Sequence, residues 1–188
     1  MLFRFLSAVL FALLIPAVAA SADEYQDTIK VFKEAGESAG FFKSSYGYAV
    51  FPTIGKAGLG IGAAHGKGRV YEKGKHIGDT SMTQGTIGFQ AGAQAFSQII
   101  FFQDARALKE FTGGNFEFSA EAQAVAITAA AGAQASTTGS SAGASGGRHD
   151  ATTVGKYQKG MATFTVAKGG LMYQATIGGQ KFSYAPVK

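Results

Sequence analysis

The chain lacks cysteine and tryptophan altogether, has only 3 prolines among its 188 residues, and carries charge on only 15% of them. Without cysteine the protein can form no disulfide, no thiolate metal site, no cysteine nucleophile and no lipid-modified cysteine. Its stability must therefore come from a hydrophobic core alone. The length suits a single domain that is large enough to bury such a core.

The first 22 residues have the pattern of a secretory signal peptide. A short basic start ends at Arg4, a mainly apolar run of eleven residues follows at 5–15, and Pro16 precedes two small-x-small sites that end at Ala19 and Ala22. The alternative is a membrane anchor, but this run falls short of the roughly 20 residues that span a bilayer as a helix. We therefore expect a signal peptide over 1–22 and a single domain over 23–188. That domain should be exported to the periplasm or cell envelope, either soluble or peripheral to a membrane.

Residues 23–42 are expected to form an amphipathic helix. Apolar residues recur there at spacings of three and four, which places them on one helical stripe: Tyr25, Ile29, Phe32, Ala35, Ala39 and Phe42. The helix either docks on the core or inserts at a membrane surface. Its five acidic and two basic residues give a net charge of −3, which argues against insertion into anionic lipid because membrane-surface helices usually carry lysine and arginine.

Beyond residue 46 the apolar period changes toward two and glycine becomes frequent, which predicts short strands separated by turns. Asp104 is expected to cap a short helix over 105–111. The Ser/Gly tract 136–147 predicts a flexible loop. The expected strands are 46–54, 57–64, 84–102 as two strands or one strongly bent strand, 116–130, 161–166, 171–177 and 180–184, with turns at 66–68, 73–75 and 178–179.

These elements predict an α+β fold. Its main part is a predominantly antiparallel, glycine-rich β-sheet or a closed β-sandwich or barrel, with the N-terminal amphipathic helix and a short helix near 104–111. The second expected strand places Gly58, Gly60 and Gly62 on one face. A strand face without side chains predicts close approach by another backbone or by a bulky aromatic residue.

Positive charge is concentrated in two segments. Residues 43–75 carry six basic residues and one acidic residue, a net charge of +5, and residues 148–188 have the same balance. A fold that gathers these segments on one face would attract the phosphates of lipids or nucleic acid. The alternative is ordinary solvated turns, since glycine flanked by lysine is common at hairpin tips. Export and the lack of a recognisable binding motif argue against nucleic acid.

No motif for catalysis is convincing. The G-x-S-x-G matches at 139–143 and 143–147 lie in the Ser/Gly tract, without the strand and helix that a nucleophile elbow needs. Residues 62–68 have one residue too few for a phosphate loop. His65, His76 and His149 have no metal-ligand spacing. We therefore expect a protein that is not an enzyme and has no cofactor.

The segment from Tyr46 to Val70 resembles the opening of the SYLF domain, a lipid-binding family found in bacteria and eukaryotes. An apolar run ends there in Phe51-Pro52, and a Lys56-Ala57-Gly58 turn and a glycine-alternating strand follow. The resemblance continues through 84–94, 101–111 and 168–172, so it covers about residues 40–184. It implies an exported bacterial relative of the yeast actin-patch SYLF proteins that binds anionic membrane lipids. Eukaryotic members bind phosphoinositides, and some also bind actin filaments.

The leading hypothesis is a non-enzymatic, exported domain whose basic turns contact anionic phospholipid headgroups. Actin and phosphoinositides are not expected as partners after export, and the acidic N-terminal helix departs from the family pattern. The alternative is a structural or scaffolding protein of the cell envelope that binds another protein through its sheet. Lys56 matches the family motif, and the other expected lipid-binding residues follow from charge density or apolar character: Lys67, Arg69, Lys73, Lys75, Lys43, Phe41 and Phe42.

Overall fold

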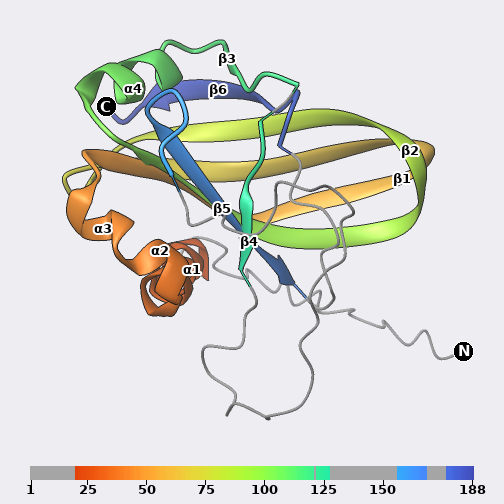
Figure 1. Cartoon of the computed structure of the whole chain (residues 1–188), viewed down its shortest axis with the longest axis horizontal. Coiled ribbons are helices and arrows are strands. Elements are labelled where there is room, and N and C mark those ends of the chain that lie inside the picture. The colour runs from red at the N-terminus through yellow and green to blue at the C-terminus, as the bar shows by residue number, and fades with distance from the viewer. Residues whose placement is uncertain (1–19, 121, 128–155, 169–176) are drawn as a thin grey trace, which may run out of the picture.

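The computed structural model describes residues 20–120, 122–127, 156–168 and 177–188 (Figure 1). The predicted leader up to residue 19, the loop 136–147 and residues 171–176 of one expected strand lie outside this part of the chain. The helices are α1 (Ala20–Glu34), α2 (Gly36–Ala39), α3 (Phe41–Ser44) and α4 (Ala105–Phe111). The strands are β1 (Gly47–Glu72), β2 (Lys75–Phe102), β3 (Phe116–Glu117), β4 (Val125–Ile127), β5 (Met161–Lys168) and β6 (Lys181–Pro186).

The six strands form one curled sheet, and every pairing is antiparallel except that of β4 with β5. This confirms the predicted α+β class with a predominantly antiparallel sheet. The sheet has two halves. The C-terminal half of β2 pairs with β5, and the N-terminal half of β2 pairs with β6.

One long hairpin, β1–β2, runs through both halves. Its turn is at Lys73 and Gly74, which have φ angles of 49° and 81°, as a tight hairpin turn requires. Halfway along, the register shifts between Leu59 and Ile61, where Gly60 has a φ of +73°. The two-stranded ribbon bends here and folds back over itself, and Figure 1 shows both strands curving together at one end of the molecule.

Glycine allows the two halves of β1 to approach closely. A Cβ atom at Gly68 would lie 2.6 Å from the Phe51 ring, and a Cβ atom at Gly66 would lie 2.6 Å from Ile54 Cγ1. The expected close approach is confirmed at Gly58, where a Cβ atom would meet the backbone of Gly62. The predicted turn at 66–68 is wrong, because these residues lie within β1 and their glycines serve packing instead.

The main core lies where the two halves of the hairpin meet. Phe51, Ile54 and Ile100 from one half share a cluster with Met82 and Phe182 from the other. Helix α4 closes this cluster, with the Phe111 ring 5.0 Å from the rings of both Phe102 and Phe182. The predicted cap of α4 is confirmed, since Asp104 Oδ1 accepts a 2.8 Å hydrogen bond from the Ala107 amide.

Helix α1 covers a second core cluster. Its buried stripe is the predicted one, namely Tyr25, Ile29 and Phe32, followed by Ala35 just after the helix ends. These side chains pack with residues of β2 and β5 such as Phe101 and Phe164. The helix therefore docks on the core. The single helix expected over 23–42 is instead broken into three, because Ala35 is extended and the poor helix former glycine follows at 36 and 40.

Two strand predictions need correction. The strands expected at 46–54 and 57–64 are one continuous strand. Pro52 is tolerated because it lies at a register shift between Phe51 and Ile54 and so interrupts no regular ladder bond. The stretch 84–102, expected as two strands or one strongly bent strand, lies within the single strand β2, so the second alternative is confirmed. Of the strand expected over 116–130, only the short β3 and β4 are present among its described residues.

Candidate functional site

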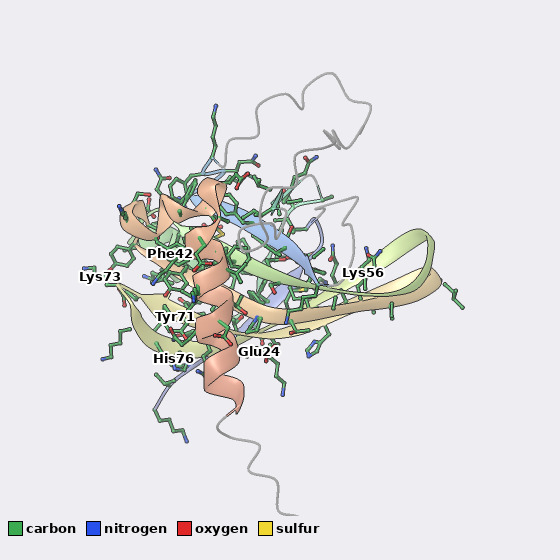
Figure 2. The ribbon with its side chains drawn as sticks, turned by 90° about the horizontal axis from the view of Figure 1, so that it is seen from below. Glu24, Phe42, Lys56, Tyr71, Lys73 and His76 are labelled. Carbon is green, nitrogen blue, oxygen red and sulfur yellow. The ribbon has the colours of Figure 1, made fainter. Side chains whose placement is uncertain are left out.

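The structure does not bring all of the predicted lipid-binding residues together. Lys73 and Lys75 lie at the hairpin turn, Lys67 and Arg69 lie further along β1, and Lys56 lies in the other half of β1, near the bend. Figure 2 shows Lys73 and Lys56 far apart, with Lys73 at the turn and Lys56 toward the bend. The positive charge thus follows the length of β1 and forms no single cluster.

Aromatic side chains and lysines gather at the turn end of the hairpin. The ring centroids of Phe42 and Tyr48 are 5.3 Å apart, those of Tyr48 and Tyr71 are 5.1 Å apart, and those of Tyr71 and His76 are 5.6 Å apart. Figure 2 shows Phe42, Tyr71 and His76 in a row beside α1. We call Phe42, Tyr46, Tyr48, Lys73 and His76 the turn-end surface, and Tyr71 lies buried beneath it.

Exposed lysines lie over this surface. Lys73 Nζ is 5.1 Å from the centre of the Tyr46 ring, and Lys33 Nζ is 5.5 Å from the centre of the Phe42 ring. Such contacts hold an ammonium group in place without neutralising it, because the ring carries no net charge. The turn-end surface can therefore offer positive charge and amphipathic rings together, a combination suited to a membrane interface.

Three tyrosines at or beside this surface, Tyr25, Tyr46 and Tyr48, have a raised pKa. Burial raises the pKa of Tyr48 to about 12. A hydrogen bond with Glu72 is the main cause of the raised pKa of Tyr46. Burial also raises the pKa of Tyr25, against the opposing effect of Arg69. These three side chains therefore stay uncharged near neutral pH and do not offset the lysine charge.

Arg69 is engaged within the protein. Its guanidinium lies 4.3 Å from the centre of the Tyr25 ring, and its Nε is 3.9 Å from Asp79 Oδ1. His76 Nε2 is 3.1 Å from the same carboxylate oxygen. Arg69 therefore helps to hold α1 against β1, and its charge is partly offset by Asp79. Lys67, Lys73 and Lys75, in contrast, make no ion pair with any described residue.

Phe41 and Phe42 are half-buried and packed against the fold. The Phe41 ring centroid is 5.5 Å from that of Phe101 and 5.1 Å from those of Phe164 and Tyr157. The Phe42 ring contacts Phe101 as well as Tyr48. These contacts fix α3, where exposed Lys43 also lies, to the β-sheet.

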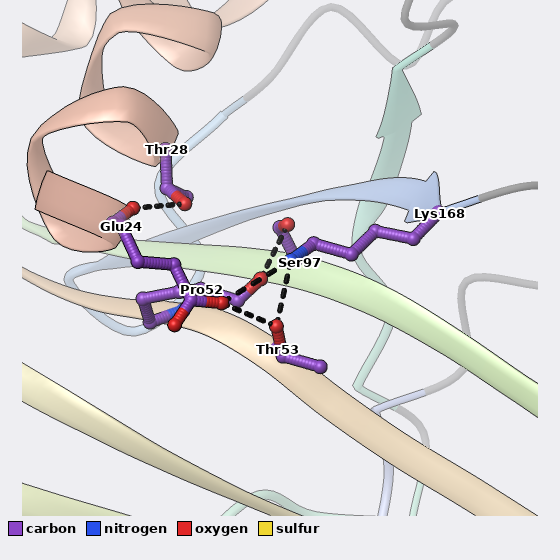
Figure 3. A network of polar contacts seen from close by, with 6 residues as sticks. All are labelled: Glu24, Thr28, Pro52, Thr53, Ser97 and Lys168. Atoms are coloured by element: carbon purple, nitrogen blue, oxygen red, sulfur yellow. Dashed lines mark hydrogen bonds and ion pairs between the residues drawn. The ribbon is translucent and has the colours of Figure 1, made fainter. Parts of the chain in front are cut away.

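A polar network that sequence reasoning missed fixes the start of α1 (Figure 3). Lys168 Nζ of β5 donates to Thr53 Oγ1 of β1 at 2.6 Å and lies 3.4 Å from Glu24 Oε1 of α1. Thr53 Oγ1 in turn donates to Glu24 Oε1 at 2.7 Å. Lys168 is therefore paired, and the acidic helix is held in place partly by that pair.

Sequence reasoning also missed two exposed apolar residues at the hairpin bend. Leu59 and Ile61 are 82% and 77% exposed. Lys56, three residues before Leu59, is half-buried, and burial lowers its pKa. The absence of acidic residues between residues 47 and 71 marks this stretch as basic, but it does not show that the two apolar side chains are exposed.

The described residues contain no group of three or more histidine or acidic side chains that could hold a metal ion. No helix within them is long and apolar enough to cross a membrane.

Comparison with known proteins identifies relatives of this chain. The family model Ysc84, described as "Las17-binding protein actin regulator", matches residues 83–184, which is more than half of the chain. The chain is also 28% identical over 158 residues to beta cell expansion factor A of Aeromonas veronii, an alignment that covers 82% of this chain and 51% of that protein. The chain thus spans about half the length of this curated relative. The match to the family model, over β2, α4 and the strands that follow, shows that the chain belongs to the Ysc84 (SYLF) family.

Proposed function

We propose that the protein is an exported, non-enzymatic domain that binds anionic phospholipid headgroups through basic residues of the β1–β2 hairpin. The observation that carries this proposal is the charge along β1. No acidic residue occurs from Gly47 to Tyr71. Lys67 and Lys73 in that hairpin are exposed and have no ion-pair partner in the described part of the chain.

Unpaired lysines suit this role because they need not break an internal ion pair to meet a phosphate. Near an anionic membrane each such cation contributes about 1 kcal/mol. Lys67 and Lys73 together would therefore strengthen binding by about 2 kcal/mol, or roughly 30-fold. The tyrosines of the turn-end surface add rings that are stable at the boundary between water and lipid.

The family's description names Las17 binding and actin regulation. We do not propose these partners for this protein, because the leader predicts export and an exported protein would not meet the cytoskeleton. The acidic outer face of α1 also argues against the helix as the lipid-binding element. Its apolar stripe is already buried against β2 and β5.

Vesicle co-sedimentation of the protein without residues 1–22 tests the proposal. Binding should require anionic lipid and should weaken as salt rises, because salt screens exposed charges. The double variant Lys67→Gln/Lys73→Gln should lose roughly 30-fold in affinity.

The control is Lys30→Gln/Lys181→Gln, which removes the same charge from two lysines that already face glutamates at 3.9 and 3.6 Å. It should bind nearly as well as the unchanged protein. Equal, salt-insensitive binding to neutral and anionic vesicles would refute the electrostatic mechanism, and equal losses in the two double variants would refute the choice of residues. Failure to bind any vesicle would favour the alternative of a protein partner in the cell envelope.

A further inference from the structure

The bend of the β1–β2 hairpin exposes the two least buried large apolar side chains in the described part of the molecule. Leu59 is 82% exposed and Ile61 is 77% exposed, whereas the next values are 44% for Val187 and 39% for Val31. The bend itself depends on Gly60, whose φ of +73° suits glycine. Neither aliphatic side chain is buried by the fold, so the core does not require them. Apolar side chains exposed together at one end of a molecule indicate an interaction site.

The charge around the bend favours an anionic membrane as the partner. From Gly47 to Tyr71 every charged side chain is basic, and from Thr80 to Gln103 no residue is charged at all. This part of the hairpin can therefore approach an anionic surface without repulsion and without moving a carboxylate out of water. The surroundings of Val31 differ, because the carboxylates of Asp27 and Glu34 lie one helical turn to either side of it on α1.

The spacing along β1 also fits a membrane boundary. Lys56 precedes Leu59 by three residues, about 10 Å in a strand. Apolar faces of interfacial proteins enter the boundary between headgroups and acyl chains by about 5–10 Å. When Leu59 lies at that boundary, the flexible Lys56 side chain can reach the phosphate layer.

We propose that the bend inserts Leu59 and Ile61 into the headgroup–acyl boundary of an anionic bilayer while Lys56 contacts lipid phosphates. This inference rests on the lipid binding proposed above and names the part of the molecule that enters the membrane. It requires the hairpin to lie along the bilayer surface, so that Lys67 and Lys73 also meet headgroups while the bend enters. It assigns insertion to the bend instead of to Phe41 and Phe42, whose rings already pack against β2 and β5.

The pairing of the strands limits the depth of insertion. On either side of Gly60, β1 and β2 pair with each other, so their facing backbone groups are satisfied. Over residues 84–94, β2 pairs only with β1 among the described residues, and β1 has no other partner there. The outer edges therefore keep polar backbone groups that are costly in hydrocarbon. The bend should enter the interface and stop short of the bilayer centre.

The absence of tryptophan allows a direct test. Leu59→Trp and Ile61→Trp each introduce the single tryptophan of the chain. Vesicles of phosphatidylcholine and phosphatidylglycerol, with acyl chains brominated near the headgroup, report insertion by quenching. Both variants should show blue-shifted emission and strong quenching on binding. Val31→Trp, on the exposed face of α1, is the matched control and should keep the emission of a water-exposed tryptophan.

The outcomes separate this inference from the proposed function. If the variants co-sediment with vesicles but Leu59→Trp stays unquenched, the inference is wrong and lipid binding stands. Stronger quenching of Val31→Trp would also overturn it. If no variant co-sediments, both proposals fail. A blue shift of Leu59→Trp that depends on protein concentration without vesicles would identify a second copy of the chain as the partner and overturn the inference.

A second variant measures the contribution of the apolar side chains. Leu59→Ser/Ile61→Ser should weaken binding to anionic vesicles by on the order of tenfold or more. Its melting temperature should be unchanged, because both side chains are exposed in the fold. Unchanged vesicle affinity in this variant would contradict the inference even if the lysine variants behave as expected.

Discussion

Gly66→Ala should destabilise the protein because the two halves of β1 meet at this glycine. An added Cβ atom would lie 2.6 Å from Ile54 Cγ1, 2.9 Å from the Thr53 carbonyl oxygen and 3.2 Å from Ile54 Cα. Two of these three neighbours are backbone atoms, which cannot rotate away. Overpacking of this kind lowers the free energy of unfolding by about 1–3 kcal/mol. Replacing glycine also reduces the conformational entropy of the unfolded chain, which raises the free energy of unfolding by about 0.4–1 kcal/mol. The net loss should be about 1–2 kcal/mol.

The matched control is Gly55→Ala in the same strand. A Cβ atom there would meet nothing within 4 Å, so the substitution acts only by reducing the entropy of the unfolded chain. The free energy of unfolding of this variant should therefore rise by about 0.4–1 kcal/mol. For a chain of this size, 1 kcal/mol corresponds to about 2–4 °C. Thermal unfolding followed by circular dichroism should therefore show opposite shifts. Equal melting temperatures for the two variants would refute the claim that the hairpin folds back on itself at Gly66.

Two further predictions concern the core and the turn-end surface. Gln98→Leu should lower the free energy of unfolding, measured in urea, by about 1–3 kcal/mol, because Gln98 Nε2 donates a 2.9 Å hydrogen bond to the Oε1 of fully buried Gln180. The double variant Gln98→Leu/Gln180→Leu should recover part of this loss. If it recovers none, the two side chains are not paired as described. The pKa of Tyr48 is raised to about 12 in the fold, so its contribution to stability is complete below pH 10 and is lost between pH 10 and 12. Between pH 10 and 12 the free energy of unfolding should therefore fall less in Tyr48→Phe than in the unchanged protein. Identical pH profiles of the two proteins would refute the raised pKa of Tyr48.

The sequence alone predicts correctly those features of the fold that depend on residues close together in the chain. The stripe of Tyr25, Ile29 and Phe32 depends only on helical spacing, and the cap at Asp104 depends on four consecutive residues. Both are confirmed. The fold class also followed from the period of two and the frequent glycines. These features are set by neighbours in the chain, so their patterns can be seen without the fold.

The fold-back of the hairpin could not be predicted in the same way. Gly66-Lys67-Gly68 has the composition of a turn, but its glycines are needed because Phe51 and Ile54 approach from more than ten residues away. A period of two shows which residues share a face but does not show where a long strand bends.

The candidate site was predicted only in part for a related reason. The charge of a segment does not state how its side chains are distributed in space, so Arg69 was grouped with Lys67 although Arg69 is engaged with Tyr25 and Asp79. The exposure of Leu59 and Ile61 was likewise hidden, since alternation with glycine also suits a buried face.

The continuous hairpin restricts how the length of this protein can vary. Since β1 and β2 share one ladder through both halves of the sheet, a residue inserted into either strand would turn every following side chain to the opposite face. The ladder is already interrupted at three places, between Phe51 and Ile54, between Leu59 and Ile61, and between Val70 and Tyr71. Insertions and deletions within the hairpin can be absorbed at these irregularities, because a bulge there restores the alternation beyond it.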